Sequence, residues 1–283
     1  MNEQTLRIID ANLDRTTEGL RVLEDIARFV LENSSVAGIL KNLRHTIHQA
    51  FPDYSINLIS ARDSAADVGR LVEHKKEPAT NLVDTVITNA RRVEQSLRVL
   101  EEASRLPESL AKIAIFEDAR YLMYELEKEL VSRLCRGDKC TKLGSYAIVD
   151  NETRLFKAIE RRFRTIQFDP GTLTQREFYR LAEDSRERSR AGNFLLIIGV
   201  HLGITLSSNA DGVALNESSV PISVARNLLK VDQIIGYAAK SPEEAIQAES
   251  CGADYILCSE SLKEHISSEV KIPVISPVRE DSE

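Results

Sequence analysis

The chain has 283 residues, a length that suggests two domains at about 150 residues per domain. Hydrophobic residues make up 42% and charged residues 29%, a globular composition that excludes a disordered chain. The net charge of −7 gives no general attraction for nucleic acid or anionic membranes, and no apolar stretch approaches the roughly 18 residues of a membrane span. We therefore expect neither a nucleic-acid partner nor a membrane partner.

The four cysteines point neither to a disulfide framework nor to a zinc site. Cys135 and Cys140 are spaced C-x4-C, and Cys251 and Cys258 are spaced C-x6-C, neither of which is usual for zinc. The N-terminal segment MNEQTLRIIDANLDR has neither the basic start nor the apolar stretch of a secretory signal. We therefore expect free thiols and a cytoplasmic protein.

Residues 3–134 have the pattern of long helices. Breakers that contain proline stand at Phe51-Pro52, Glu77-Pro78 and Leu106-Pro107, and they divide the region into two pairs of long helices with a looser segment at about 52–80. We predict a helical domain over residues 1–137, with Arg136-Gly137-Asp138-Lys139 as a hinge to the next domain.

This helical half contains an internal repeat. The segment NLDRTTEGLRVLEDIARF, which begins at Asn12, matches NARRVEQSLRVLEEASRL, which begins at Asn89, at 8 of 18 positions and at an offset of 77 residues. The helices that follow correspond more loosely, with Arg44 aligned to Arg120 at an offset of 76. Two copies of a helical hairpin predict a four-helix bundle with a pseudo-twofold axis.

Helical periodicity places a polar pair of each copy on or beside the apolar face. Asn12 lies on that face with Arg15 about 60° away, and Asn89 and Arg92 lie in the same way in the second copy. An arginine near a core needs a partner, so one interpretation is an internal network of arginines and carboxylates that fixes helix register. The other is an anion site, because the planar guanidinium suits phosphate. We keep both and take these four residues as candidate phosphate-binding residues.

Other charged residues of these helices have different expected roles. Arg44 and Arg120 could add positive charge to the anion site from neighbouring helices, and we include Arg44 among the candidates. Arg21, Glu24 and Arg28 lie on the other side of the first helix at i,i+3 and i,i+4 spacings, which predicts a surface ladder of ion pairs.

The connector over residues 61–74 is too polar for a core. Its segment ARDSAADVG contains Arg62 and Asp67, which we take as candidate catalytic residues. The Asp67 carboxylate could hold Mg²⁺ together with substrate phosphates, or it could simply cap a turn. The chain contains no G-x-x-x-x-G-K-[ST] motif, which excludes a P-loop nucleotide site.

Residues 144–277 have a different pattern, in which short apolar runs alternate with helical stretches. This alternation predicts a parallel sheet covered by helices. We therefore predict a β/α (TIM-type) barrel over residues 138–283, incomplete or degenerate because an eighth strand is missing. The predicted strands are Tyr146–Val149, Thr165–Phe168, Phe194–Ile198, Gly212–Leu215, Gln233–Tyr237, Asp254–Leu257 and Ile272–Ile275.

The helical half resembles a known family. The strings RIIDANLDRTTEGLRVLEDIARFV, LRH, RDSAADVG and the second RVLEE occur in order over about residues 5–134. They resemble the alternative hydroxymethylpyrimidine-phosphate kinase of thiamine biosynthesis, a helical domain often fused to thiamine-phosphate synthases. The resemblance implies phosphorylation of the pyrimidine monophosphate to the diphosphate, with ATP and Mg²⁺ as cofactors.

The second half resembles the thiamine-phosphate synthase barrel through SYAIVD, TIQF, ADGVAL and IIGYAAKSPEEAIQAESCGADYIL. Several of the family's polar motifs are altered: Asp169 and Gly171 stand where the family has Arg and Lys, and Ala238 and Lys240 replace a Ser-x-His pair. The family's Gly-Gly phosphate loop is absent after Ser276-Pro277. We therefore expect this domain to be a degenerate, truncated synthase whose synthase activity is doubtful.

These observations predict an α plus α/β protein that phosphorylates hydroxymethylpyrimidine phosphate through its helical domain. Two alternatives stay open: a bifunctional fusion with thiamine-phosphate synthase activity, and a non-catalytic protein that binds or regulates in the thiamine pathway. The expected partner is the small pyrimidine phosphate, and a homodimer is a further alternative.

Overall fold

The computed structural model describes residues 2–50, 55–63, 80–106 and 113–279. The chain divides into two compact units, Met1–Leu134 and Cys135–Glu283. This division lies close to the domain boundary predicted after residue 137.

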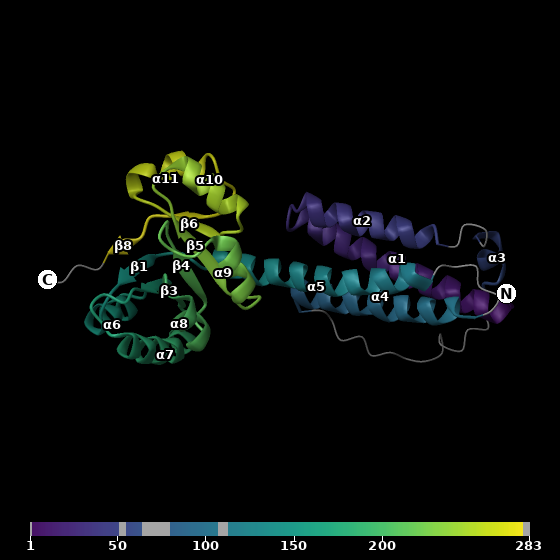
Figure 1. Ribbon diagram of the computed structural model, residues 1–283, viewed down its shortest axis with the longest axis horizontal. Coiled ribbons are helices and arrows are strands. Elements are labelled where there is room, and N and C mark those ends of the chain that lie inside the picture. Colours follow the sequence, from purple (N-terminus) through teal and green to yellow (C-terminus); the bar gives the residue numbers. More distant parts are fainter. Residues whose placement is uncertain (1, 51–54, 64–79, 107–112, 280–283) are drawn as a thin grey trace. The chain divides into compact units, whose positions relative to one another are not determined.

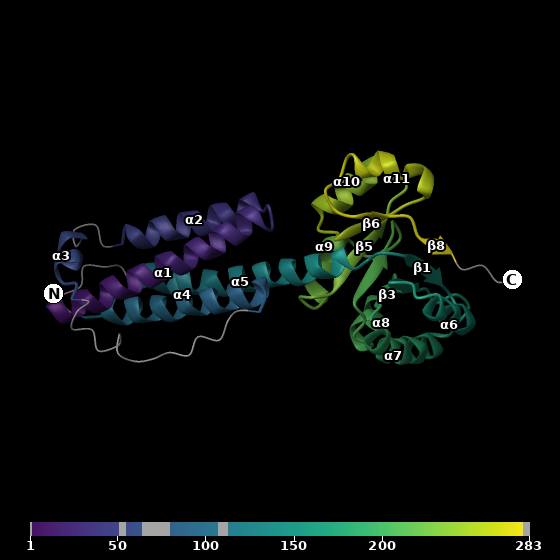
Figure 2. The same ribbon diagram turned by 180° about the vertical axis from the view of Figure 1, so that it is seen from behind.

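The described part of the first unit is helical. Asn2, Asn33 and Asn81 cap α1, α2 and α4, each through a side-chain oxygen that accepts a backbone N–H three residues further on. The four long helices run along one another (Figures 1 and 2). Among the described residues, no helix combines the length and the apolar character needed to cross a bilayer. The helices are α1 (Glu3–Phe29), α2 (Ser34–His48), α3 (Ser55–Ser60), α4 (Leu82–Ser104) and α5 (Ile113–Thr141).

One apolar core joins these helices. Helix α1 packs against both α2 and α4, and all five helices contribute buried residues to the core. At Gly19, helices α1 and α4 approach closely: a Cβ there would lie 2.6 Å from Val93 Cγ2 and 3.3 Å from the carbonyl oxygen of Asn89. A larger residue would force the two helices apart, because protein interiors are closely packed.

Two buried carboxylates link neighbouring helices of this unit. Arg44 of α2 donates to Glu24 Oε2 of α1 through Nε and Nη2, at 3.2 and 3.1 Å. In α4, the 1% exposed side chain of Glu101 pairs with Arg120 of α5 at 3.5 Å and with two arginines of its own helix. Glu24 and Glu101 occupy equivalent positions of the sequence repeat. Arginine–carboxylate pairs therefore do lie within the helical unit, at positions other than Arg15 and Arg92.

The predicted surface ladder on α1 is wrong. Glu24 is only 8% exposed, because α2 packs beside it and supplies Arg44 as its partner. Arg21 pairs with Asp25 instead, at 3.7 Å, and the Arg28 guanidinium lies over the Phe29 ring at 4.7 Å from its centre.

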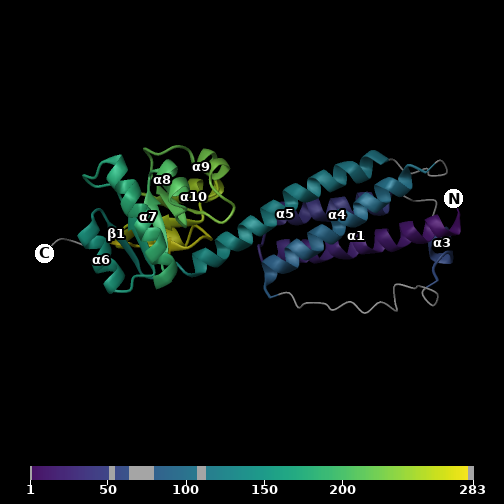
Figure 3. The same ribbon diagram turned by 90° about the horizontal axis from the view of Figure 1, so that it is seen from below.

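The second unit is an eight-stranded parallel sheet surrounded by helices (Figures 1 and 3). The strand order is β7-β6-β5-β4-β3-β2-β1-β8, and every neighbouring pair is parallel. The strands are β1 (Tyr146–Val149), β2 (Thr165–Phe168), β3 (Leu195–Gly199), β4 (Gly212–Leu215), β5 (Ile234–Ala238), β6 (Tyr255–Leu257), β7 (Val274–Ile275) and β8 (Val278–Arg279). The helices are α6 (Glu152–Glu160), α7 (Gln175–Gly192), α8 (Leu202–Ser207), α9 (Ile222–Leu228), α10 (Pro242–Ser250) and α11 (Glu260–Ser267).

The prediction of a missing eighth strand is wrong. After β7 pairs with β6, only Ser276 and Pro277 intervene before β8 pairs with β1. One C-terminal segment therefore hydrogen-bonds to both edges of the sheet. This arrangement protects edge strands that would otherwise offer unpaired backbone groups.

The segment predicted as a hinge is helical, because α5 continues through residues 136–139 to Thr141. Within the second unit, Arg136 Nε donates to Asp254 Oδ1 at 3.0 Å and Lys139 Nζ donates to Asp232 Oδ2 at 2.9 Å. These pairs anchor the last turns of α5 beneath the strands, so a sequence segment rich in charge and containing Gly137 stays helical.

We expect a fragment of residues 1–141 to fold without the second unit. Among the described residues, the buried members of its apolar core all lie in α1 to α5. Circular dichroism should show a helical spectrum and a cooperative thermal transition. A non-cooperative melt would show that the second unit contributes to the stability of the first.

Candidate functional site

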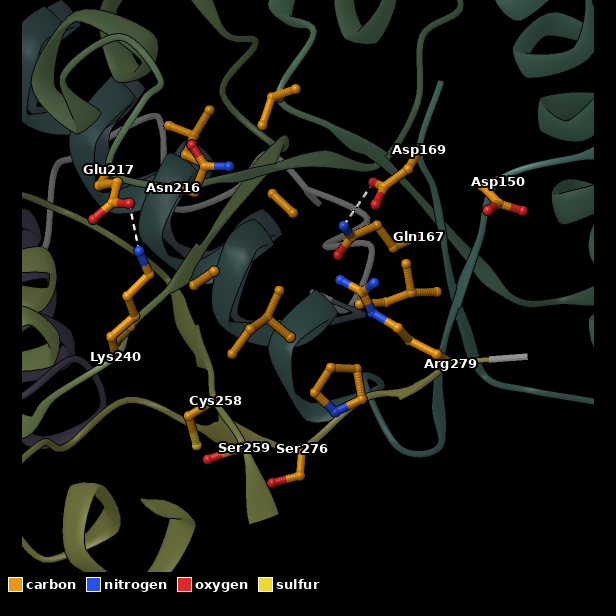
Figure 4. A pocket seen from close by; sticks show the side chains of 18 of the residues that line it. Asp150, Gln167, Asp169, Asn216, Glu217, Lys240, Cys258, Ser259, Ser276 and Arg279 are labelled. Atoms are coloured by element: carbon orange, nitrogen blue, oxygen red, sulfur yellow. Dashed lines mark hydrogen bonds and ion pairs between the residues drawn. The ribbon is translucent and has the colours of Figure 1, made fainter. Parts of the chain in front are cut away.

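One candidate site lies at the carboxyl ends of the barrel strands, where parallel β/α barrels carry their functional residues. A cavity of about 1040 Å³ opens there (Figure 4). Its polar lining comes from six different strands or from the residues that directly follow them, so residues far apart in the sequence meet around one opening. These residues include Asp150 after β1, Gln167 and Asp169 at the end of β2, Asn216 and Glu217 after β4, Lys240 after β5, Ser259 after β6 and Arg279 in β8.

Asp169 is the half-buried carboxylate of this cavity. Its Oδ1 accepts a hydrogen bond from Gln167 Nε2 at 2.8 Å. Burial raises the pKa of Asp169 and the charge of Asp150 raises it further, whereas the Gln167 hydrogen bond and the charges of Arg279 and His201 oppose the rise. Figure 4 shows Asp150, Asp169 and Arg279 on the same side of the cavity. This side can therefore present carboxylate, amide and guanidinium groups to one ligand.

Two buried tyrosines fix the orientation of Gln167. The Tyr146 hydroxyl donates to Gln167 Oε1 at 2.8 Å and lies 3.1 Å from the Tyr255 hydroxyl. Burial raises the pKa of both tyrosines well above the ordinary value, so both hydroxyls remain protonated donors. Because Gln167 Oε1 faces Tyr146, its NH₂ group must face Asp169 and the cavity.

We expect Tyr146→Phe to lower the free energy of unfolding by about 2 kcal/mol, because it leaves the buried Gln167 oxygen without its donor. Tyr179→Phe is the matched control: Tyr179 donates to Glu183 at an exposed position on α7, and its loss should cost under about 0.5 kcal/mol. Urea unfolding measures both values. Equal losses of unfolding free energy in the two variants would mean that the buried hydrogen bond from Tyr146 to Gln167 contributes little to stability.

The backbone at the end of β3 passes close to the Asp169 carboxylate. A Cβ on Gly199 would lie 1.8 Å from Asp169 Oδ1, so only glycine leaves room for the carboxylate. The next residue, Val200, lines the cavity with a φ of 50°, in the left-handed region that β-branched residues rarely adopt. Strain of this kind persists where the surrounding structure enforces it, often at functional sites.

Lys240 lies on the other side of the cavity, where it forms an ion pair with Glu217 (Figure 4). The Glu217 hydrogen bond raises the pKa of Lys240, which therefore stays charged. Both side chains are exposed, and an exposed pair opens at little cost, so Lys240 is free to bind an incoming anion. His201, which the sequence also places at a strand end, packs against the Phe178 ring at 5.5 Å and does not line this cavity.

A divalent cation at this cavity would have to share its ligands with a substrate. In the part of the chain that the structure describes, no three His, Cys, Asp or Glu side chains cluster to hold a metal ion. Mg²⁺, however, commonly uses one or two carboxylates together with substrate phosphates. The carboxylates of Asp150 and Asp169, which lie on one side of the cavity, fit that pattern.

A second pocket, of about 670 Å³, lies in the helical unit between α1 and α4. It brings together four of the candidate residues predicted from the sequence: Asn12 and Arg15 from α1, and Asn89 and Arg92 from α4. Asn12 is buried, whereas both arginines are exposed. The same stripe of each repeat copy therefore faces one pocket.

The remaining candidates lie elsewhere. Arg44 is outside the lining of this pocket and pairs with Glu24. Arg62 donates to both carboxylate oxygens of Asp10, at 2.6 and 2.9 Å, and also pairs with Asp14. Asp67, the candidate catalytic and Mg²⁺-binding residue, lies outside the described residues.

Sequence reasoning missed Asp150 and Arg279. Asp150 directly follows a predicted strand, and that position could have marked it as a residue of the barrel opening. Arg279 lies beyond the last strand predicted from the sequence, and two-residue strands leave no periodic signal.

Two family profiles match separate parts of the chain: the ThiD2 family over residues 7–129, and thiamine monophosphate synthase over residues 145–273. Curated relatives span both parts. Thiamine-phosphate synthase of Synechocystis sp. is 35% identical over 256 residues, which cover 88% of this chain and 73% of that protein. The enzyme of the same name from Rhodopirellula baltica is 30% identical over 266 residues, covering 89% and 71%.

Among solved structures, a thiamine phosphate pyrophosphorylase from Pyrococcus furiosus is 29% identical with a TM-score of 0.43, covering 49% of this chain and 76% of that one. The sequence matches correct one expectation. The second unit is a homologue of thiamine-phosphate synthases and not a degenerate remnant, because the family profile matches almost all of its described length and the relatives extend across it. Altered individual motifs do not remove it from that group.

Proposed function

This chain belongs to the thiamine-phosphate synthase family, and on that premise we propose that its barrel unit joins hydroxymethylpyrimidine diphosphate to thiazole phosphate with release of diphosphate. The observation that carries the proposal is the cavity of about 1040 Å³ at the carboxyl ends of the strands. A cavity of this size can accommodate two small substrates at once.

The groups around the cavity suit the charges of such a reaction. Lys240 and Arg279 offer positive charge to the phosphate groups from two sides. Gln167, held by Tyr146, offers its NH₂ group and positions the Asp169 carboxylate. If Mg²⁺ binds with Asp150 and Asp169, it would neutralise charge on the departing diphosphate.

The test is formation of thiamine phosphate by the full chain with both substrates and Mg²⁺, followed by chromatography. We expect turnover of roughly 0.1 per second or faster, at the low edge of enzyme rates. Asp169→Ala should abolish most of it, whereas Tyr179→Phe should not. An absence of product from folded protein would contradict the proposal.

A second activity is favoured by the pocket between α1 and α4. We infer that the helical unit phosphorylates hydroxymethylpyrimidine phosphate to the diphosphate with ATP as donor. The match to the ThiD2 family and the meeting of Asn12, Arg15, Asn89 and Arg92 support this inference. The product of this reaction is the substrate of the proposed synthase, so one chain would supply two consecutive steps.

A coupled assay for ADP release, with and without hydroxymethylpyrimidine phosphate, tests the kinase separately from the synthase. We expect ADP release that depends on the pyrimidine substrate. Release that is independent of this substrate, or no release, would contradict the kinase proposal and leave the synthase proposal untouched.

A further inference from the structure

Ten of the described residues line the pocket between α1 and α4, and they form five equivalent pairs. Each lining residue of α1 has a counterpart in α4 that lies 77 positions later in the sequence. Both halves of the repeat therefore present the same stripe to one cavity. The pairs are Asn12 with Asn89, Arg15 with Arg92, Glu18 with Gln95, Gly19 with Ser96, and Val22 with Val99.

The two asparagines hold their amides in the same way. Asn12 Nδ2 donates to the Ile8 carbonyl at 2.7 Å, and Asn89 Nδ2 donates to the Thr85 carbonyl at 2.8 Å. In each case one amide hydrogen is used within the helix. In α1 the side-chain oxygen accepts from the arginine three residues later. Arg15 Nη1 lies 3.4 Å from Asn12 Oδ1.

The two arginines differ from several other arginines of this unit. Within the described ranges, Arg44, Arg62, Arg98, Arg105 and Arg120 all have carboxylate partners. Over the same residues, no carboxylate lies within ion-pair distance of Arg15 or Arg92, although both line a cavity of about 670 Å³. Fixing helix register therefore does not account for them, since the buried Glu24 and Glu101 already serve that purpose.

We propose that this pocket is a diphosphate clamp in which Arg15 and Arg92 each bind one phosphate group of the same ligand. The identity of that ligand rests on the proposed kinase, for which it would be the pyrimidine diphosphate product. Guanidinium groups suit phosphate because they donate two parallel N–H bonds. Among the described lining residues, Glu18 is the one carboxylate, and it breaks the chemical equivalence of the two stripes because its counterpart is Gln95. It reduces the charge of the pocket from +2 to +1.

A clamp with two equivalent halves has a distinctive binding signature. We would titrate the full chain with inorganic phosphate and with pyrophosphate by calorimetry. Pyrophosphate should bind at least about 10-fold more tightly than phosphate, because it uses both arginines. Arg15→Ala and Arg92→Ala should each weaken pyrophosphate about 30-fold, which corresponds to about 2 kcal/mol, and should weaken phosphate only about twofold, because one half-site remains.

Two further variants complete the set. Glu18→Gln should tighten pyrophosphate several-fold by removing the opposing charge. Arg28→Ala, an exposed arginine of α1 outside the pocket, should change neither affinity. Because the barrel cavity can also bind pyrophosphate, hydrogen exchange locates the event: pyrophosphate should slow exchange in peptides that cover residues 8–22 and 85–99.

Loss of pyrophosphate affinity in only one of Arg15→Ala and Arg92→Ala, equal losses for phosphate and pyrophosphate, or protection confined to the barrel unit would each overturn the clamp. The outcome is separate from the kinase assay, because binding needs no turnover. Clamp binding without ADP release would contradict only the kinase, and ADP release without this binding pattern would contradict only the clamp.

Discussion

Glu101→Ala should lower the free energy of unfolding by about 3 kcal/mol, because it removes the buried partner of a cluster of arginines. The Glu101 side chain is 1% exposed, and Oε1 accepts from Arg98 at 2.8 Å and from Arg105 at 2.6 Å. Arg120, itself mostly buried, lies 3.5 Å from Oε2. Without the carboxylate, that mostly buried guanidinium would lose the ion pair at 3.5 Å. Urea unfolding of the full chain measures the loss.

Glu102→Ala is the matched control. Glu102 is the adjacent residue and pairs with Arg98, but its side chain is 50% exposed, so its loss should cost under about 1 kcal/mol. A similar loss of unfolding free energy in both variants would mean that burial of the glutamate does not determine how much it stabilises the fold.

The pH dependence of stability gives a second readout for Glu101. Burial raises the pKa of its carboxyl, but the Arg105 hydrogen bond and the charges of Arg98 and Arg120 outweigh burial and lower it. A lowered pKa means that Glu101 stabilises the fold above the ordinary glutamate pKa of about 4.3 and loses this contribution as the pH falls. Stability should therefore fall less steeply below about pH 4.3 in Glu101→Ala than in the parent. An unchanged slope would contradict the charged pairing.

The helical unit shows what repetition in a sequence can predict. Two repeat positions carry the pocket residues: an asparagine at Asn12 and Asn89, and an arginine at Arg15 and Arg92. Each pair lies on the same stripe of its helix, and this suffices to predict that all four line one pocket. The burial of Glu24 was not predicted, because the periodicity of α1 alone does not indicate which of its faces α2 and α4 will cover. Arg44, the ion-pair partner of Glu24, was predicted to bind phosphate. An arginine near a core can pair with either a phosphate or a carboxylate, and the sequence alone does not distinguish them.

The barrel unit shows a different limit. Strands β1, β2 and β4 were predicted to the residue, because each is a short, mostly apolar or β-prone segment bounded by charged or polar residues. Strand β8 was missed because two residues after a proline have no pattern of their own, and pairing with β1 arises only when the sheet curves round. The interior path from Tyr255 through Tyr146 to Gln167 likewise joins residues from three strands, and no local spacing reveals it.

Gly199→Ala should lower thiamine phosphate formation about 100-fold, the size of effect expected when a reacting group is displaced by about 1 Å. The added Cβ would lie 1.8 Å from Asp169 Oδ1, so the carboxylate must leave its place and its hydrogen bond to Gln167. The free energy of unfolding should fall by only about 1–3 kcal/mol, the usual cost of overpacking, so the variant should remain folded at 25 °C. Steady-state kinetics beside urea unfolding separates the two effects.

The loss of activity should pass through Asp169 and not through general damage to the barrel. Gly203→Ala is the control, because a Cβ there meets no atom within 4 Å, and it should change neither activity nor folding appreciably. The decisive comparison is a double-mutant cycle: once Asp169→Ala has removed the carboxylate, Gly199→Ala has nothing to displace and should add less than about twofold. If Gly199→Ala instead lowered the residual activity of Asp169→Ala by a further 100-fold, the strand itself would be distorted. Asp169 would then not be the group through which Gly199 acts.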